Sequence, residues 1–182
     1  MNDIIIGDKK TFAIGYSFFD DTRETELSMY VEGRNLLEYK HDEEMFTTRW
    51  NLNDLVVWLS DFLKNMADDP FPFDVEGACL AEKDNNAREF ETEDLDAFDA
   101  YYEKLSNWNE RHRWHPASSG AYLADVYFAL IGNEVEISWD NTDAEDGIEF
   151  TSQKGFARIP EEEFKTVLKQ FIREYVDHWY KP

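Results

Sequence analysis

The residues best suited to chemistry form a basic cluster in an otherwise acidic chain: Arg111, His112, Arg113 and His115. His112 and His115 are three residues apart, close enough on a helix to share a metal ion. No third ligand follows at a convincing spacing, and two histidines do not complete a tetrahedral site. Cations in the last turn of a helix are also stabilised by its dipole, by roughly 0.3 to 1 kcal/mol each. We therefore predict a structural or surface role for this cluster and no metal site.

Other searches for catalytic or cofactor motifs find no HExxH, GxGxxG, GxxxxGKS/T, GxSxG or CxxC pattern. The turn from Asp140 to Gly147 superficially resembles a calcium loop, but Ala144 occupies position 5, where an EF-hand needs an oxygen ligand, and Glu145 occupies position 6, where it needs glycine. The sequence therefore predicts no cofactor, and a non-enzymatic role is favoured over an enzymatic one.

The charge balance narrows the classes of partner. The 182 residues include 18 Lys and Arg against 40 Asp and Glu, a formal net charge of −22. Such a chain repels nucleic-acid phosphates and anionic membranes and attracts basic proteins. Cys79 is the only cysteine, no stretch is long and apolar enough to span a membrane, and the N-terminus lacks the features of a signal peptide. We expect one cytoplasmic domain, residues 1–182, with a basic protein partner.

A second helix is expected from Glu93 to Trp114, with carboxylates crowded at its start. Acidic residues in a first helical turn are favoured by the dipole. The excess here continues beyond one turn, so it is either a solvated face or a recognition surface. The candidate partner-binding residues are Glu91, Glu93, Asp94, Asp96, Asp99 and Glu103.

Two other helices and two hairpins complete the prediction. Asn51 is placed to cap a helix that ends before Asp68, and Pro160 to begin the last helix. Alternation predicts a hairpin of Val126–Leu130 and Val135–Trp139 joined by Gly132-Asn133, with Glu134, Glu136 and Ser138 on a face open to water. The second hairpin pairs Ile148–Thr151 with Phe156–Ile159, and 71–86 reads as irregular, with Asn85 and Asn86 in a mobile loop.

An N-terminal antiparallel meander is predicted before the first helix. Its strands are Asp3–Ile6, Thr11–Phe19, Glu24–Glu32, Asn35–Tyr39 and Phe46–Trp50. Together these elements predict an α+β fold: a mostly antiparallel sheet, built from the meander and the later hairpins and packed by about three helices.

Two segments, LNDLVVWLSDFL and RHRWHPASSGAYLADVYFALIGNEVEISWDN, resemble the non-catalytic N-terminal region of some bacterial ImmA/IrrE-type metallopeptidase chains. The resemblance covers about a third of the chain. It implies a bacterial origin and a place among phage, mobile-element or conflict genes. The zinc-binding HExxH of the peptidase domain is absent, so the resemblance implies neither protease activity nor zinc.

Three functional hypotheses follow. The leading one is an acidic protein-binding domain, such as an immunity protein or antitoxin that covers the basic site of a toxin. The second is a nucleic-acid mimic that occupies the DNA channel of a defence enzyme through carboxylates of Glu82–Glu103. The third is a ligand-binding or enzymatic pocket lined by Arg111, His112, Trp114, His115 and Trp139. Against the third, large aromatic side chains are more often core residues.

Overall fold

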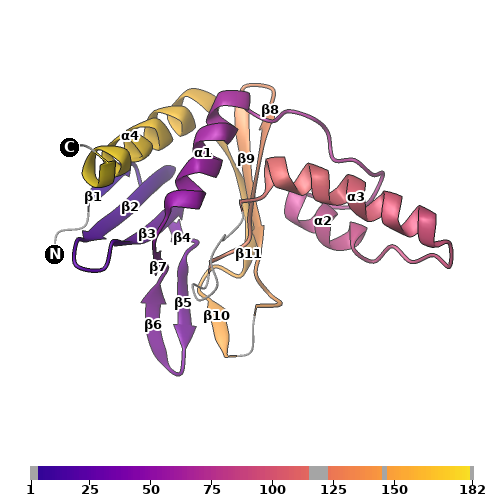
Figure 1. Ribbon diagram of the computed structural model, residues 1–182, viewed down its shortest axis with the longest axis horizontal. Helices are drawn as coiled ribbons and strands as arrows, with labels where there is room; N and C mark the ends of the chain where they lie inside the picture. The colour runs from indigo at the N-terminus through magenta and orange to yellow at the C-terminus, as the bar shows by residue number, and fades with distance from the viewer. Residues whose placement is uncertain (1–3, 115–122, 145–146, 181–182) are drawn as a thin grey trace.

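The computed structural model describes residues 4–114, 123–144 and 147–180 (Figure 1). Within these ranges, helices and antiparallel strands form the α+β fold that the sequence predicts. The elements are β1 (Ile4–Gly7), β2 (Phe12–Phe19), β3 (Glu24–Val31), β4 (Arg34–Asn35), β5 (Glu38–His41), β6 (Glu44–Thr47), β7 (Arg49–Trp50), α1 (Asn53–Asn65), α2 (Leu80–Ala87), α3 (Leu95–His112), β8 (Val126–Ile131), β9 (Glu134–Asp140), β10 (Ile148–Phe150), β11 (Lys154–Pro160) and α4 (Glu161–Tyr180).

The described strands form three antiparallel sheets where the sequence predicts one. The first has the order β1-β2-β3-β4 with β7 also paired to β3, the second β10-β5-β6, and the third β11-β9-β8. The predicted hairpin between Ile148–Thr151 and Phe156–Ile159 is wrong, because β10 pairs with β5 and β11 with β9. Pairing with β9 gives β11 a register of seven residues, from Lys154 opposite Asp140 to Pro160 opposite Glu134. A hairpin with the three-residue β10 would give fewer backbone hydrogen bonds.

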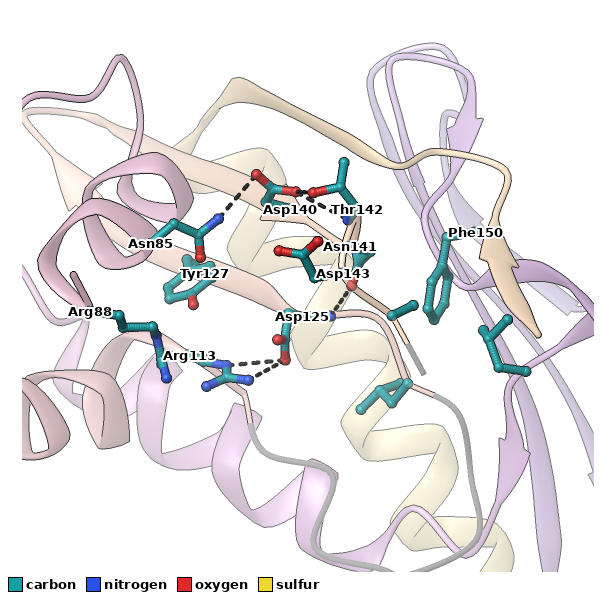
Figure 2. A pocket seen from close by; sticks show the side chains of 13 residues that line it. Asn85, Arg88, Arg113, Asp125, Tyr127, Asp140, Asn141, Thr142, Asp143 and Phe150 are labelled. Carbon is teal, nitrogen blue, oxygen red and sulfur yellow. Dashed lines mark hydrogen bonds and ion pairs between the residues drawn. The ribbon is translucent and has the colours of Figure 1, made fainter. Parts of the chain in front are cut away.

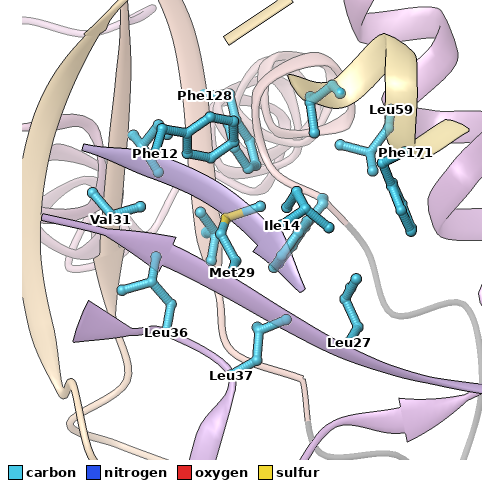
Figure 3. Close-up of a cluster of buried hydrophobic side chains, with 14 of the residues drawn as sticks. Phe12, Ile14, Leu27, Met29, Val31, Leu36, Leu37, Leu59, Phe128 and Phe171 are labelled. Carbon is cyan, nitrogen blue, oxygen red and sulfur yellow. The ribbon is translucent and has the colours of Figure 1, made fainter. Parts of the chain in front are cut away.

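The main core lies where α1 and α4 pack against the first and third sheets. Phe12 of β2 stacks on Phe164 of α4 with ring centroids 5.1 Å apart, and Tyr16 packs on Phe171 at 5.3 Å. Figure 3 shows the side chains of β2 and β3 that meet Leu59 of α1 in this layer. Burial of each large apolar side chain contributes roughly 1.5 to 3 kcal/mol, so this layer stabilises the fold.

The β8–β9 hairpin is confirmed, including its turn. Gly132 has a φ of +66°, which a residue with a side chain rarely adopts, and Val126 pairs with Trp139 at the far end. Val135, Ile137 and Trp139 face the main core, as the alternation predicts.

The prediction that the opposite face of this hairpin is open to water is wrong. Glu136 and Ser138 are buried, and Tyr127 and Ala129 belong to a second apolar cluster under α2 and α3. Figure 1 shows these two helices on the right of the third sheet, across from α1 and α4. The third sheet is therefore covered on both faces. The hydrophobic pattern of one strand pair does not reveal this second covering layer of helices.

Helix α2 explains that error, because it falls within the segment predicted to be irregular. Its eight residues, LAEKDNNA, have little helical periodicity, and Asn85 and Asn86 lie in its last turn and not in a mobile loop. The carboxylate of Glu136 accepts a hydrogen bond from the Leu80 amide at 3.0 Å, and Ser138 Oγ accepts one from the Ala81 amide at 3.2 Å. The third sheet thus satisfies backbone amides that the start of a helix leaves unpaired.

The other helix ends agree with the sequence to within two residues. Asn51 Oδ1 accepts a hydrogen bond from the Asn53 amide at 3.1 Å, although the cap position of α1 is Leu52. Pro160 closes β11, and α4 begins at Glu161 with three glutamates in its first turn. Helix α3 is shorter at both ends than the predicted Glu93–Trp114.

Candidate functional site

The strongest charge feature of the surface is a run of carboxylates between the end of α2 and the middle of α3. Between Glu89 and Glu103 there are seven acidic residues and no Lys or Arg. Every one of them is exposed, and we call this stretch, Glu89–Glu103, the acidic arm. It contains all six residues that the sequence proposes as partner-binding: Glu91, Glu93, Asp94, Asp96, Asp99 and Glu103.

The arm is arranged by the start of α3. Asp94 caps the helix, since its side chain accepts hydrogen bonds from the amides of Asp96 at 3.0 Å and Ala97 at 3.2 Å. Asp96, Asp99 and Glu103 are spaced by three and four residues and therefore lie along one side of the helix. Figure 1 shows this first half of α3 extending away from the sheets. One carboxylate thus shapes the helix, and a row of three is directed to solvent.

Two apolar side chains are exposed among these charges. Leu95 is 76% exposed and Phe98 is 40% exposed, and the Phe98 ring packs beside that of Tyr102 at 4.5 Å. Single exposed apolar residues are common on protein surfaces. Here two of them, one helical turn apart, are bordered by carboxylates, which is the arrangement of an interface with an apolar centre and a charged rim.

A buried carboxylate fixes the base of the arm. Asp84 of α2 is completely buried; its Oδ1 accepts from Asn109 Nδ2 at 2.8 Å, and its Oδ2 accepts from Tyr127 and from Arg88 Nε, each at 2.7 Å. These bonds join α2, α3 and β8 around one charge. A buried ion is tolerated only when it is paired and hydrogen-bonded in this way. Burial and the charge of Asp84 raise the pKa of Tyr127 well above its ordinary value, so its hydroxyl stays a donor.

The basic cluster at the end of α3 makes structural contacts. Arg111 Nη2 donates to Asp69 Oδ2 at 2.5 Å, and Arg113 pairs with Asp125 at 2.6 Å. His112 is buried and stacks on Trp108, with ring centroids 4.1 Å apart. Its Nδ1 lies 2.9 Å from the Phe128 carbonyl and its Nε2 lies 2.9 Å from Asp69 Oδ1. Both ring nitrogens are therefore engaged by partners within the fold, and neither is open to a metal ion.

The residues proposed for an aromatic pocket do not come together at the surface. Trp114 and Trp139 are completely buried in the main core, and Trp114 Nε1 donates to the Ala124 carbonyl at 2.7 Å. His115 lies outside the described residues. The two tryptophans therefore act as core residues, which is the alternative that the sequence also allows.

A different hollow, of about 450 Å³, lies at the base of the arm (Figure 2). One wall is polar and comes from the end of α2, the residue after α3, and the strands β8 and β9 with the turn that follows. The opposite wall is apolar and includes Ile148 and Phe150 of β10. The polar lining residues are Asn85, Arg88, Arg113, Asp125, Tyr127, Asp140, Asn141, Thr142 and Asp143.

Sequence reasoning missed this hollow because its residues come from five separate segments. One signal was available: Tyr127 places a large aromatic on the strand face predicted to be wet. An aromatic side chain there indicates that another element covers that face.

Among the described residues, no group of three or more His, Cys, Asp or Glu side chains is arranged to hold a metal ion. No helix within the described ranges combines the length and hydrophobicity needed to cross a bilayer.

Comparisons with known proteins add little. No protein-family model matches the sequence, and no curated protein matches it. One solved structure that the chain is similar to is that of CdiI from Burkholderia dolosa AUO158, with a TM-score of 0.43 and 11% identity over 94% of this chain and 99% of that chain. At this TM-score the likeness carries no information about function.

Proposed function

We propose that this chain is a non-enzymatic protein-binding domain that binds a basic protein through the acidic arm, in the manner of an immunity protein or antitoxin that covers a toxin. The observation that carries the proposal is the exposure of seven carboxylates, with no Lys or Arg among them, around Leu95 and Phe98. The motif-poor sequence and the resemblance to a region of conflict-gene proteins are consistent with such a role.

The two kinds of side chain in the arm would contribute differently to binding. Burial of Leu95 and Phe98 against a partner would supply affinity, at roughly 1.5 to 3 kcal/mol for a fully buried large apolar side chain. The carboxylates would accelerate encounter with a basic surface and select against acidic ones. The interaction is therefore expected to weaken as salt screens the charges, while the apolar contribution remains.

The base of the arm supports the proposal because it presents these groups rigidly. The Asp84 bonds hold α2, α3 and β8 together, and the Tyr101 hydroxyl donates to the Ala87 carbonyl at 3.0 Å across the two helices. A binding surface that is ordered before contact loses less conformational entropy on association.

The proposal is tested by capture from a lysate of the organism that carries the sequence, with three forms of the purified chain as bait. The arm variant carries Asp96→Asn, Asp99→Asn and Glu103→Gln. The control carries Asp21→Asn, Asp61→Asn and Glu44→Gln, the same chemical changes at exposed positions outside the arm. We expect a basic protein that the wild type and the control retain at low salt and that the arm variant loses by at least about tenfold. Equal capture by all three baits contradicts the proposal.

The row of Asp96, Asp99 and Glu103 along one side of α3 also favours a second candidate, mimicry of a nucleic-acid backbone. The captured partner separates the two. Duplex DNA added in excess competes with the chain if the partner is a DNA-binding enzyme held through its channel. A toxin whose contact surface does not bind DNA is unaffected by the same addition.

A further inference from the structure

We propose that the hollow at the base of the acidic arm binds a small zwitterion of the α-amino acid class with an apolar side chain. Its lining contains donors for a carboxylate, acceptors for an ammonium group and an apolar wall, in a volume of about 450 Å³. Binding sites for small molecules are commonly hollows of this size in which a few convergent polar groups fix the orientation of the ligand.

The donors are arginines that their ion pairs do not saturate. The Nε of Arg88 donates to Asp84, and the Nε and Nη2 of Arg113 donate to Asp125. Each guanidinium has five N–H groups in a planar fork, so both retain donors that can meet a carboxylate. Figure 2 shows Arg88 and Arg113 close together on one wall of the hollow.

Asn141 supplies an independent indication that this wall binds a ligand. It lines the hollow, it is only 8% exposed, and its Oδ1 accepts from the Asp125 amide at 2.6 Å. Its Nδ2 has no hydrogen-bond partner among the described residues. A buried N–H without an acceptor is costly, and a ligand oxygen brought to this amide would remove that cost.

The acceptors for an ammonium group come from Asp125 and Asp143. Arg113 occupies only one oxygen of Asp125, Oδ1, and Asp143 is an exposed carboxylate in the turn after β9. Asp140 is already used, because its Oδ2 accepts from Asn85 and its Oδ1 from Thr142. Figure 2 places Asp125 and Asp143 in the same hollow as the two arginines. A ligand with one charge of each sign matches this lining better than a simple anion or cation does.

The apolar wall determines the kind of side chain that the ligand carries. Ile148 and Phe150 are almost completely buried and close the hollow on the side away from α2, with Leu123 beside them. An aliphatic or aromatic side chain of the ligand would bury its own apolar surface against this wall.

Four probes dissect these requirements: L-phenylalanine, L-leucine, phenethylamine, which lacks the carboxylate, and 3-phenylpropionate, which lacks the amine. Each is titrated into the full-length chain, and binding is followed by NMR chemical shifts of the Asn85, Asn141 and Arg side-chain groups. We expect the two amino acids to bind and each one-charge analogue to bind at least about tenfold more weakly, because a hydrogen bond to a charged group contributes roughly 1.5 to 3 kcal/mol.

A variant with its control tests the acceptor side. Asp143→Asn is expected to weaken L-phenylalanine about tenfold and to leave 3-phenylpropionate unchanged, whereas Asp61→Asn on α1 changes neither. No binding of either amino acid at about 20 mM, above the millimolar range of weak ligands, overturns the proposal. The proposal is also overturned if phenethylamine or 3-phenylpropionate binds as tightly as L-phenylalanine. No basic protein takes part in these titrations, so a negative result here leaves the proposed role of the arm intact.

Discussion

The bond between Tyr127 and Asp84 gives the sharpest test of how the arm is held. Tyr127→Phe removes one hydroxyl from a completely buried carboxylate and leaves the ring in place. A hydrogen bond to a charged group contributes roughly 1.5 to 3 kcal/mol, about twice the value for a neutral pair. We expect the free energy of unfolding to fall by that amount, which lowers the Tm by roughly 3 to 12 °C for a chain of this length.

A matched control is available on α3. The Tyr102 hydroxyl donates to the Arg88 carbonyl at 2.8 Å and to the Phe90 carbonyl at 3.2 Å, so Tyr102→Phe removes a hydroxyl whose acceptors are both neutral. Urea denaturation of both variants gives the comparison, with the slope m as a check that the unfolding transition is unchanged. Tyr102→Phe is expected to lose less than about 1 kcal/mol.

A double-mutant cycle isolates the charge. In an Asp84→Asn background the acceptor is neutral, so Tyr127→Phe is expected to cost only about 0.5 to 1.5 kcal/mol. If Tyr127→Phe costs the same in both backgrounds, or no more than Tyr102→Phe, the reasoning that Asp84 is an ionised anchor for α2, α3 and β8 is refuted.

Three further predictions concern other parts of the fold. Burial opposes ionisation of Asp69, yet the hydrogen bonds from Arg111 and His112 outweigh it and lower the pKa of Asp69. The ionised form of Asp69 therefore stabilises the fold at pH values above its pKa in the unfolded chain, about 3.9, and this stability is lost as the pH falls through its pKa in the folded chain. We expect the difference in free energy of unfolding between the wild type and Asp69→Asn to shrink between about pH 5 and pH 2, as measured by urea denaturation. Phe164→Ala should cost about 3 to 5 kcal/mol in the same assay, because the ring is completely buried against Phe12 and Phe128. Leu95→Ala should change stability by less than about 0.5 kcal/mol while it weakens capture of the basic partner.

The parts of the fold that the sequence predicts are those in which local pattern and burial agree. The stripe of α4 and the alternation of Val135, Ile137 and Trp139 each face one core, so periodicity alone locates them. Helix α2 has no such pattern. It is held by Glu136 and Ser138, which are more than fifty residues away in sequence, and no local propensity encodes those bonds.

The two candidate sites differ in the same way, since one is encoded by a local run of residues and the other depends on contacts between distant segments. The acidic arm is a local feature, so its residues can be read from the sequence, although the exposure of Leu95 and Phe98 cannot. The hollow needs Arg88, Arg113, Asn141 and Phe150 to meet from α2, the end of α3, the end of β9 and β10. That meeting depends on β10 leaving β11 to pair with β5, which is the point at which the predicted topology is wrong.

Repulsion among the carboxylates of the acidic arm is expected to reduce the local stability of α3. The helix dipole favours Asp96 in the first turn but does not reach Glu103, and like charges four residues apart, such as Asp99 and Glu103, destabilise a helix by roughly 0.2 to 0.5 kcal/mol. Glu103→Lys replaces that repulsion with a favourable pair and is expected to stabilise the chain by about 0.4 to 1 kcal/mol at low ionic strength, with a smaller gain at high salt. Urea denaturation at two salt concentrations measures the gain.

The same Glu103→Lys chain separates the two interpretations of the arm. If the carboxylates only keep the surface hydrated, a lysine serves equally well and capture of the basic protein is unchanged, which would contradict the recognition role. If they form the binding surface, the more stable variant binds less, because the lysine repels a basic partner at the end of the row. A gain in stability together with a loss of binding is the expected result, since a surface kept for recognition is not optimised for folding.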